Sequence, residues 1–239
     1  MTWITDMPEL AKTIAENGAL PSLALGPRSP SELQRDFGSL QEIMGELPYA
    51  VNILVLPENP CREEQLEWIE HNRPAFVTIA AGDPAFTRRL ARKGLKVLCH
   101  VQDESLLSLA FEAGAWGVIL EGNEAGGHVG EQTTLTLAQM AMRWRRNHPD
   151  GRALRIILAG GIATRDAVNR ALLLGADLLQ MGTAYLATRE FVECKALSPL
   201  YQQHILRIRD TCLSGQSVGL RVRGLVTPQT RAVLDLERE

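Results

Sequence analysis

Residues 155–183 read RIILAGGIATRDAVNRALLLGADLLQMGT. This stretch begins with an apolar run of strand length at 155–158 and ends with a second one at 178–181. Between them a glycine pair precedes residues 165–174, whose apolar side chains recur at helical spacing. Near-continuous apolar strands joined by a helix are typical of a parallel sheet that is covered on both faces. The stretch therefore predicts one β-α-β unit.

The same alternation extends toward the N-terminus. Further apolar runs of strand length occupy residues 20–25, 50–56, 76–80, 96–101 and 117–120. Amphipathic stretches lie at 8–17, 33–44, 64–71, 85–93, 104–113 and 135–147. Successive runs are about 20 to 38 residues apart, which is near the unit of about 30 residues in a (β/α)8 barrel. We therefore predict an α/β chain with the TIM-barrel architecture.

The number of strands is one short of a complete barrel. Projecting one unit back from the run at 20–25 places a first strand just before Met1, so we expect a barrel that lacks its first strand or a piece of a longer chain. A doubly wound open sheet is the alternative fold. Residues 1–239 contain no low-complexity linker, which favours one domain, and the tail from Ser214 is expected to be a partly helical covering segment.

Composition narrows the possible partners. The chain is 45% apolar and 22% charged, as globular proteins are, and its 25 basic and 28 acidic residues give a net charge of -3. No overall positive field exists for nucleic acid or an anionic membrane, and there is no bilayer-length apolar run or secretory signal. We predict no nucleic-acid or membrane partner and a cytoplasmic location. Four widely spaced cysteines predict buried thiols and no metal site.

Two glycine-rich segments follow the last two strands of the series. Gly160 and Gly161 come after the run at 155–158, and Gln180, Met181, Gly182 and Thr183 end the run at 178–181. Adjacent glycines let backbone N–H groups approach a phosphate, and a following helix N-terminus adds partial positive charge. Loops after strands 7 and 8 are where phosphate sites recur in barrels. Phosphate binding is favoured here over ordinary tight turns.

A third glycine-rich loop, EGNEAGGHVG at 121–130, contains His128 directly after a strand. An imidazole presented over a cleft suits general acid–base chemistry near neutral pH, while a histidine pointing into solvent is the equally weighted alternative. The segment GQSVG at 215–219 fits G-x-S-x-G, but a helix-like stretch at 206–212 precedes it in place of the strand that a nucleophile elbow needs. We therefore reject a serine hydrolase.

The stretches at 121–130, LAGGIA at 158–163 and GADLLQMGT at 175–183 resemble the signature loops of the nitronate monooxygenase (2-nitropropane dioxygenase) family. That family includes the FMN-dependent enoyl-acyl-carrier-protein reductases. The resemblance implies a TIM barrel that binds FMN. It implies flavin contacts from Asn52, Glu121, Gly126, Gly127, Gly160, Gly161, Gln180, Met181, Gly182 and Thr183, the last six around the phosphate.

The resemblance also implies a catalytic role for His128. In the monooxygenases the corresponding histidine removes the proton α to the nitro group, and in the reductases it is linked to substrate binding and proton supply. Residues 81–82 resemble a further active-site loop of the family. Two features depart from the family pattern, because its first strand with a Gln-Gly-Pro-Met-like end is absent and Glu121 stands where many monooxygenases have glutamine.

We therefore predict an FMN-dependent oxidoreductase that uses O2 to oxidise nitronates or nitroalkanes to a carbonyl compound and nitrite. The alternatives are an FMN-dependent enoyl-thioester reductase driven by NAD(P)H and a non-catalytic remnant or scaffold domain. MTWITD at the start and the GHVG loop also resemble the version of this domain found inside polyketide-synthase-type polypeptides. The expected partner is a small-molecule substrate. Unpaired strand edges favour a homodimer or docking to a larger polypeptide.

Overall fold

The computed structural model describes residues 7–80, 83–195, 198–207, 210–219 and 221–238. The chain forms two compact units, each described by itself below. The first unit comprises Met1–Val101, Ser105–Val118 and Asp150–Leu154, and the second comprises Gln102–Glu104, Ile119–Pro149 and Arg155–Glu239. That the whole chain is one domain stays a prediction.

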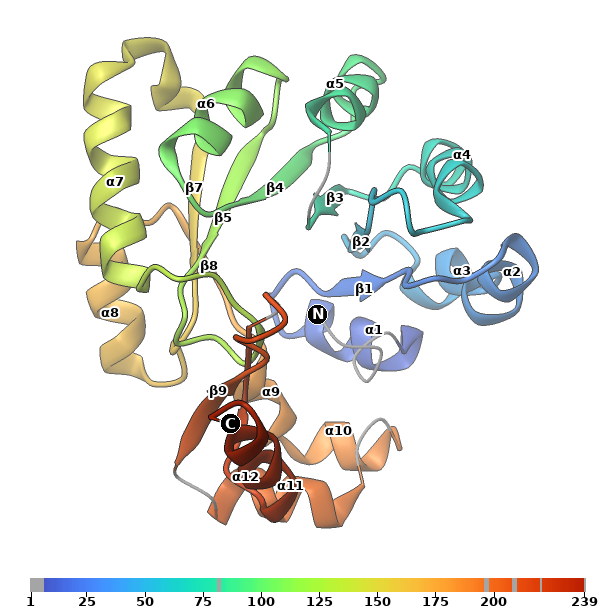
Figure 1. The fold of residues 1–239 in the computed structure, drawn as a ribbon. Helices are drawn as coiled ribbons and strands as arrows, with labels where there is room; N and C mark the ends of the chain where they lie inside the picture. Colours follow the sequence, from blue (N-terminus) through green and yellow to red (C-terminus); the bar gives the residue numbers. More distant parts are fainter. Residues whose placement is uncertain (1–6, 81–82, 196–197, 208–209, 220, 239) are drawn as a thin grey trace. The chain divides into compact units, whose positions relative to one another are not determined.

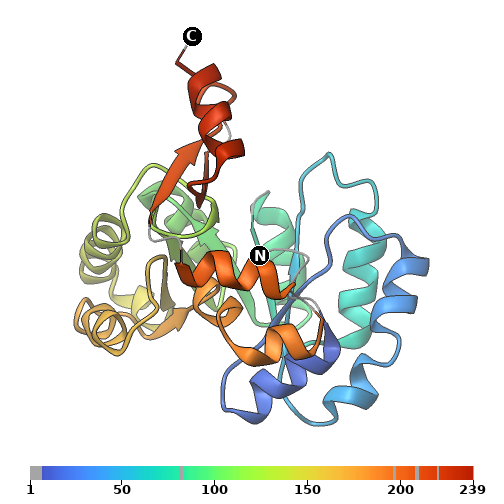
Figure 2. The ribbon, with the colours of Figure 1, turned by 90° about the horizontal axis from the view of Figure 1, so that it is seen from below.

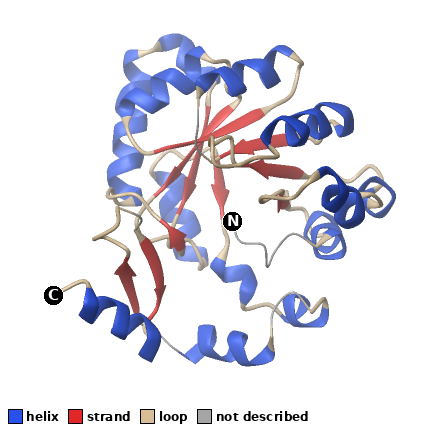
Figure 3. Cartoon of the chain, turned by 45° about the vertical axis from the view of Figure 1, so that its right-hand side comes forward, coloured by secondary structure: helices blue, strands red, loops and turns tan. Residues whose placement is uncertain are grey.

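The main sheet has seven strands in the order β1-β2-β3-β4-β5-β7-β8. They are β1 (Ser22–Ala24), β2 (Ala50–Ile53), β3 (Phe76–Ile79), β4 (Val97–Val101), β5 (Gly117–Glu121), β7 (Arg155–Ala159) and β8 (Leu178–Gln180). Helices alternate with these strands (Figures 1 and 3). The spatial order follows the chain without the reversal that defines a doubly wound sheet. The predicted α/β fold of the TIM-barrel type is confirmed, and each of the seven predicted runs contains a strand.

The first unit is built around four parallel strands. Ala50 of β2 lies opposite Ser22 of β1 and Phe76 of β3, and Val77 of β3 lies opposite Val97 of β4. All four residues of β2 are buried, as a parallel strand covered on both faces requires. The helices between residues 7 and 113 are α1 (Pro8–Glu16), α2 (Pro30–Phe37), α3 (Leu40–Met44), α4 (Arg62–Asn72), α5 (Pro84–Arg92) and α6 (Glu104–Glu112).

The stretch at 33–44, predicted as one helix, is two. Ser29 begins α2 with a capping box to Glu32, and α3 starts only at Leu40. Gly38 and Ser39 separate the two helices because both residue types have weak helix propensity, and Ser39 leaves helical geometry at φ -96° and ψ 6°. At the end of α2, hydrogen bonds from the Arg35 and Arg28 guanidinium groups lower the pKa of Asp36 to about 2.

The second unit contains β7 and β8, which pair in parallel with Leu158 opposite Leu179. Helix α7 (Thr134–Asn147) contacts β7, and α8 (Arg165–Leu173) contacts β8; the two helices lie side by side in Figure 1. Short helices follow β8, namely α9 (Thr183–Leu186), α10 (Arg189–Glu193) and α11 (Pro199–Arg207). Asp177 fixes the start of β8, because its carboxylate accepts the N–H of Ile156 and pairs with Arg145.

A separate three-stranded antiparallel sheet belongs to the second unit. Its order is β6-β10-β9, with β6 (Gly127–His128), β10 (Val222–Leu225) and β9 (Thr211–Ser214). The prediction of a helix-like stretch at 206–212 is wrong, because α11 ends at Arg207 and residues 211–214 gain sheet hydrogen bonds from β10. Residues 215–219 form the connection between β9 and β10, not a strand-to-helix elbow, and α12 (Pro228–Leu236) follows the hairpin (Figure 2).

The four cysteines are free thiols. Cys99 is buried, and burial raises its pKa, so it is a weak nucleophile. Cys61, Cys194 and Cys212 are only half-buried, so the prediction of buried thiols is wrong for these three. Among the residues that the structure describes, no helix has the length and apolar character that a membrane span needs.

Candidate active site

The predicted site residues lie mostly in the second unit, where three parallel strands end. Glu121 is the last residue of β5, Gly160 follows the last residue of β7, and Gln180 is the last residue of β8. Carboxyl ends of parallel strands share one edge of a sheet, which is where ligands bind in α/β proteins.

The glycine pair after β7 has a backbone that other residues rarely adopt. Gly160 has φ +103° and Gly161 has φ +67°. A Cβ at Gly160 would come within 2.9 Å of Thr134 Oγ1, and one at Gly161 within 3.2 Å of Glu124 Cβ. Three residues later the Thr164 side chain accepts the N–H of Ala167 and starts α8. This loop therefore packs closely on the loop after β5 and leads directly into a helix N-terminus.

Two residues that the sequence analysis did not single out fasten these loops together. The Glu124 carboxylate accepts from Thr134 N at 2.9 Å and from Thr134 Oγ1 at 2.8 Å. The same hydroxyl lies 3.1 Å from the carbonyl oxygen of Ala159, which also accepts the N–H of Gly122 at 3.1 Å. A Cβ at Gly122 would lie 2.1 Å from Thr134 Oγ1 and 2.2 Å from Thr134 N. The only sequence signal for them is their position, because Glu124 lies within the glycine-rich loop at 121–130 and Thr134 follows it.

The loop after β8 also meets the loop after β5. A Cβ at Gly126 would lie 2.9 Å from Thr183 Oγ1, so these two predicted site residues are neighbours. Gly182 is the N-cap residue of α9, and a Cβ there would have no atom within 4 Å. Gln180 and Met181 are half-buried, while Gly182 and Thr183 are exposed. The structure thus brings together predicted residues from all three strand ends.

His128 is exposed and lies in β6, opposite Val222 of β10. Gly127 has φ +96°, and a Cβ there would meet no atom within 4 Å. The histidine is therefore held in a strand and not in the open loop that the sequence suggested. An accessible imidazole on a fixed backbone can exchange protons with a small molecule.

Asn52, another predicted flavin contact, lies in the first unit. The Asn52 side chain is 7% exposed, and its Nδ2 donates to the carbonyl oxygen of Thr78 at 3.3 Å. Its amide is thus partly used within the sheet. Glu121 is half-buried at the end of β5. The predicted loop at 81–82 lies outside the described residues.

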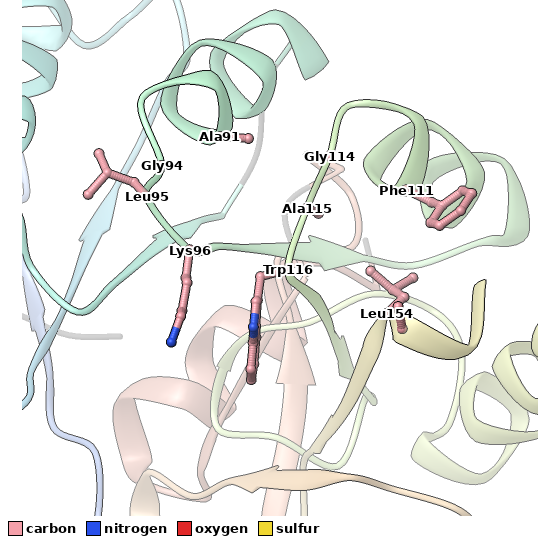
Figure 4. Close-up of a pocket in the computed structure, with 10 residues that line it drawn as sticks. Ala91, Gly94, Leu95, Lys96, Phe111, Gly114, Ala115, Trp116 and Leu154 are labelled. Atoms are coloured by element: carbon pink, nitrogen blue, oxygen red, sulfur yellow. The ribbon is translucent and has the colours of Figure 1, made fainter. Parts of the chain in front are cut away.

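Two cavities lie away from these residues. One of about 400 Å³ in the first unit is lined by Lys96, Trp116 and mainly apolar residues that precede β4, β5 and β7 (Figure 4). Another of about 250 Å³ in the second unit lies between residues 102–104 and α7. None of the predicted site residues lines either cavity. Within the described ranges, no group of three or more histidine, cysteine, aspartate or glutamate side chains could hold a metal ion.

Comparison with known proteins identifies the family. The family model for nitronate monooxygenase matches residues 57–235, which is most of the chain. The chain belongs to the nitronate monooxygenase family. It is 27% identical to a probable nitronate monooxygenase of Staphylococcus saprophyticus, over 91% of this chain and 72% of that protein. It is 24% identical to the nitronate monooxygenase of Pseudomonas aeruginosa, over 91% of this chain and 73% of that protein.

Solved structures agree with this assignment. The structure of FabK from Thermotoga maritima superimposes with a TM-score of 0.83 at 32% identity, covering 99% of this chain and 72% of that one. A nitroalkane oxidase from Streptomyces ansochromogenes shares the fold, with a TM-score of 0.80 at 22% identity over 97% of this chain and 76% of its own. The predicted family is confirmed, and the chain is an enzyme of the flavin-dependent oxidoreductase kind.

Proposed function

We propose that this chain binds FMN and oxidises alkyl nitronates or nitroalkanes with O2, giving a carbonyl compound and nitrite. The observation that carries the proposal is the meeting of three glycine-rich segments at the ends of β5, β7 and β8, next to the segment that holds His128. The names of the curated relatives from Staphylococcus saprophyticus and Pseudomonas aeruginosa support the nitronate as substrate.

The described residues fit the phosphate end of FMN. Gly160 and Gly161 have the positive φ angles of a backbone turn that can present N–H groups to an anion, and Thr164, three residues after the pair, is the N-cap of α8. Gly182 leaves open space in the loop after β8, beside Thr183. We assign the phosphate to these residues with Gln180 and Met181, and the ring to Glu121, Gly126 and Gly127. A flavin contact from Asn52 stays a prediction of the resemblance. Bound FMN would supply the redox chemistry by taking electrons from the substrate and passing them to O2.

His128 acts as the general base in this proposal. A neutral nitroalkane must lose a proton from the carbon beside the nitro group before it becomes a nitronate. A neutral imidazole can take that proton, and the electron pair of the broken C–H bond stays on the substrate. A nitronate supplied ready-made needs no such step.

The first experiment tests the cofactor. We expect the purified chain to show flavin absorption and to release a cofactor with the mass of FMN. Flavin adenine dinucleotide in the released fraction would contradict FMN. A protein that stays colourless after FMN is added would contradict the proposal and favour a non-catalytic scaffold domain.

The second experiment tests the role of His128. We expect His128→Ala to lose most of its turnover of neutral nitroalkanes, by about 100-fold, and to keep turnover of preformed nitronates, because general-base catalysis contributes about 10²–10⁴-fold. His204→Ala is the matched control, since His204 is an exposed histidine of α11. Equal nitroalkane oxidation by His128→Ala and the wild type would remove His128 from the mechanism.

Reduction of an enoyl thioester is the second candidate. Glu121, which stands where many monooxygenases have glutamine, favours it. The enoyl reductase domain of MlnA from Bacillus amyloliquefaciens also has this fold, with a TM-score of 0.73 at 17% identity. Consumption of NADPH that depends on an enoyl thioester, with no nitrite formed from nitronates, would select this function. A cytoplasmic location and a homodimer or a larger polypeptide partner remain predictions.

A further inference from the structure

The segment that carries His128 is held by the C-terminal hairpin. Val222 of β10 lies opposite His128, and Arg223 lies opposite Gly127. Val129 N donates to the carbonyl oxygen of Arg221 at 3.0 Å. These contacts join residues that are more than 90 positions apart in the sequence.

Arg223 makes the side-chain part of this connection. Its Nε donates to the carbonyl oxygen of Asn123 at 2.5 Å, and its Nη1 donates to Thr211 Oγ1 of β9 at 2.8 Å. Asn123 in turn donates from Nδ2 to the carbonyl oxygen of Glu131 at 2.9 Å and from its N–H to that of Gln132 at 2.8 Å. One guanidinium therefore links both strands of the hairpin to the base of the loop that contains His128.

This loop needs an external support. Gly126, Gly127 and Gly130 surround His128, and glycine loses more conformational freedom on ordering than any other residue. β6 is two residues long and lies next to β10 in its sheet. A general base loses effectiveness when its placement shifts by about 1 Å. The connection to the hairpin thus holds the backbone of His128 in place.

We propose that Arg223 is a positioning residue for His128, and that the hairpin of β9 and β10 is part of the active-site structure. This inference rests on the proposed function of His128 as a base. The exposed ion pair between Arg221 and Glu131 adds little, because the Glu131 side chain is 74% exposed and such pairs are weak. Arg223 differs, since it is half-buried and donates in two directions.

The activity test compares two substrates. We expect Arg223→Ala to lower kcat/KM for a neutral nitroalkane by about 10- to 100-fold, because a 1 Å displacement of a catalytic group has effects of this size. Turnover of the corresponding nitronate should change by less than about threefold, because that reaction does not need the base. Arg223→Ala in a His128→Ala background should have little further effect on the nitroalkane reaction. Full additivity of the two losses would overturn the proposal.

Arg223→Lys and Arg231→Ala are the companion variants. Lysine keeps the charge but lacks the planar fork, so we expect Arg223→Lys to recover only part of the nitroalkane activity. Arg231 is an exposed arginine of α12, and its replacement should leave both activities unchanged. Full activity in Arg223→Lys would show that the positive charge alone matters, and it would overturn the proposal that the two guanidinium hydrogen bonds position His128. Arg223→Lys also serves as the test variant if Arg223→Ala does not fold.

Hydrogen–deuterium exchange provides a measurement that does not depend on turnover. We expect the amides of residues 123–131 to exchange at least about tenfold faster in Arg223→Ala than in the wild type, with exchange in β7 unchanged, because local opening is governed by local contacts. Unchanged exchange at 123–131 would overturn the proposal. A wild type inactive on both nitroalkane and nitronate would instead overturn the proposed function, and the exchange result would still decide whether Arg223 holds the loop.

Discussion

The two ends of the β-strands are built in opposite ways. At the carboxyl ends of β5 and β7, glycines allow the loop backbones to approach one another closely. The Glu124 carboxylate accepts hydrogen bonds from the backbone N–H and the hydroxyl of Thr134 there. At the amino ends of β3, β4 and β5, large side chains pack against one another. The Phe76 and Trp116 rings meet edge to face at 4.9 Å, and Lys96 Nζ lies 5.3 Å from the Phe76 ring centroid.

This difference matches a division of labour known for barrels. Residues at the carboxyl ends of barrel strands serve function, while those at the amino ends serve stability. A glycine that packs against backbone, such as Gly122, cannot accept an added atom, whereas an aromatic cluster is weakened when atoms are removed. Substitutions at the carboxyl ends should therefore impair flavin binding, with or without a loss of stability, whereas those at the amino ends should lower stability alone.

The largest effect is expected at Gly122. A methyl group there would lie 2.2 Å from the backbone nitrogen of Thr134, and backbone cannot move aside as a flexible side chain can. We expect Gly122→Ala to lower the free energy of unfolding by about 3 kcal/mol, as overpacking does, and to abolish flavin retention. Urea denaturation and the flavin absorbance of the purified protein measure the two effects.

Gly224→Ala is the control for that substitution, because a Cβ at Gly224 would meet no atom within 4 Å. It should unfold at nearly the same urea concentration as the wild type. Full flavin content and wild-type stability in Gly122→Ala would contradict the conclusion that the carboxyl ends of the strands depend on close glycine packing.

Trp116→Ala tests the other end. Trp116 is half-buried, so Trp116→Ala should lower the free energy of unfolding by about 2 kcal/mol, which is below the range for a fully buried tryptophan. Because Trp116 precedes β5 and does not line the glycine loops, the folded fraction should keep its flavin. We expect a lower midpoint of thermal unfolding at an unchanged ratio of flavin to protein. A colourless but folded Trp116→Ala protein would show that this end also serves the cofactor.

Thr134→Val removes one hydroxyl from the connection between the loops. The Glu124 carboxylate then keeps the backbone N–H of Thr134 but loses the hydroxyl donor, which we expect to lower the free energy of unfolding by about 1 kcal/mol. FMN affinity should fall as well, because Gly160 packs on this hydroxyl. Fluorescence titration of the apoprotein with FMN measures that affinity. Thr136→Val, which removes an exposed hydroxyl from the same helix, should leave it unchanged.

The smallest effect is expected for Lys96→Met. This substitution keeps a flexible apolar chain but removes the charge that lies over the Phe76 and Trp116 rings. An exposed cation–π contact is worth about 0.5 kcal/mol, so the thermal midpoint should drop by about 1–2 °C. Lys96→Arg should keep the wild-type midpoint. A change in FMN affinity in Lys96→Met would contradict the assignment of this region to stability.

Many residues of the candidate site can be predicted from the sequence, because they lie at positions that local sequence patterns define. Apolar runs locate the strand ends, and Gly160, Gly161 and Gly182 follow them directly. Glu124 and Thr134 are different, since a glutamate in a loop and a threonine at a helix start are common features of any surface. Their meaning comes only from the bond between them, which no local pattern contains.

By itself, the sequence determined the positions of the seven strands, most of the helices that join them and the glycine loops at the strand ends, although the stretch at 33–44 is two helices and not one. These features depend on hydrophobic periodicity and backbone freedom over a few neighbouring residues. Only the tertiary structure decided that residues 211–214 form a strand, that β10 pairs with the segment of His128, and that Asn52 turns its amide to Thr78. Those outcomes depend on which distant segment supplies a hydrogen-bond partner, and the choice is made by the packing of the whole unit.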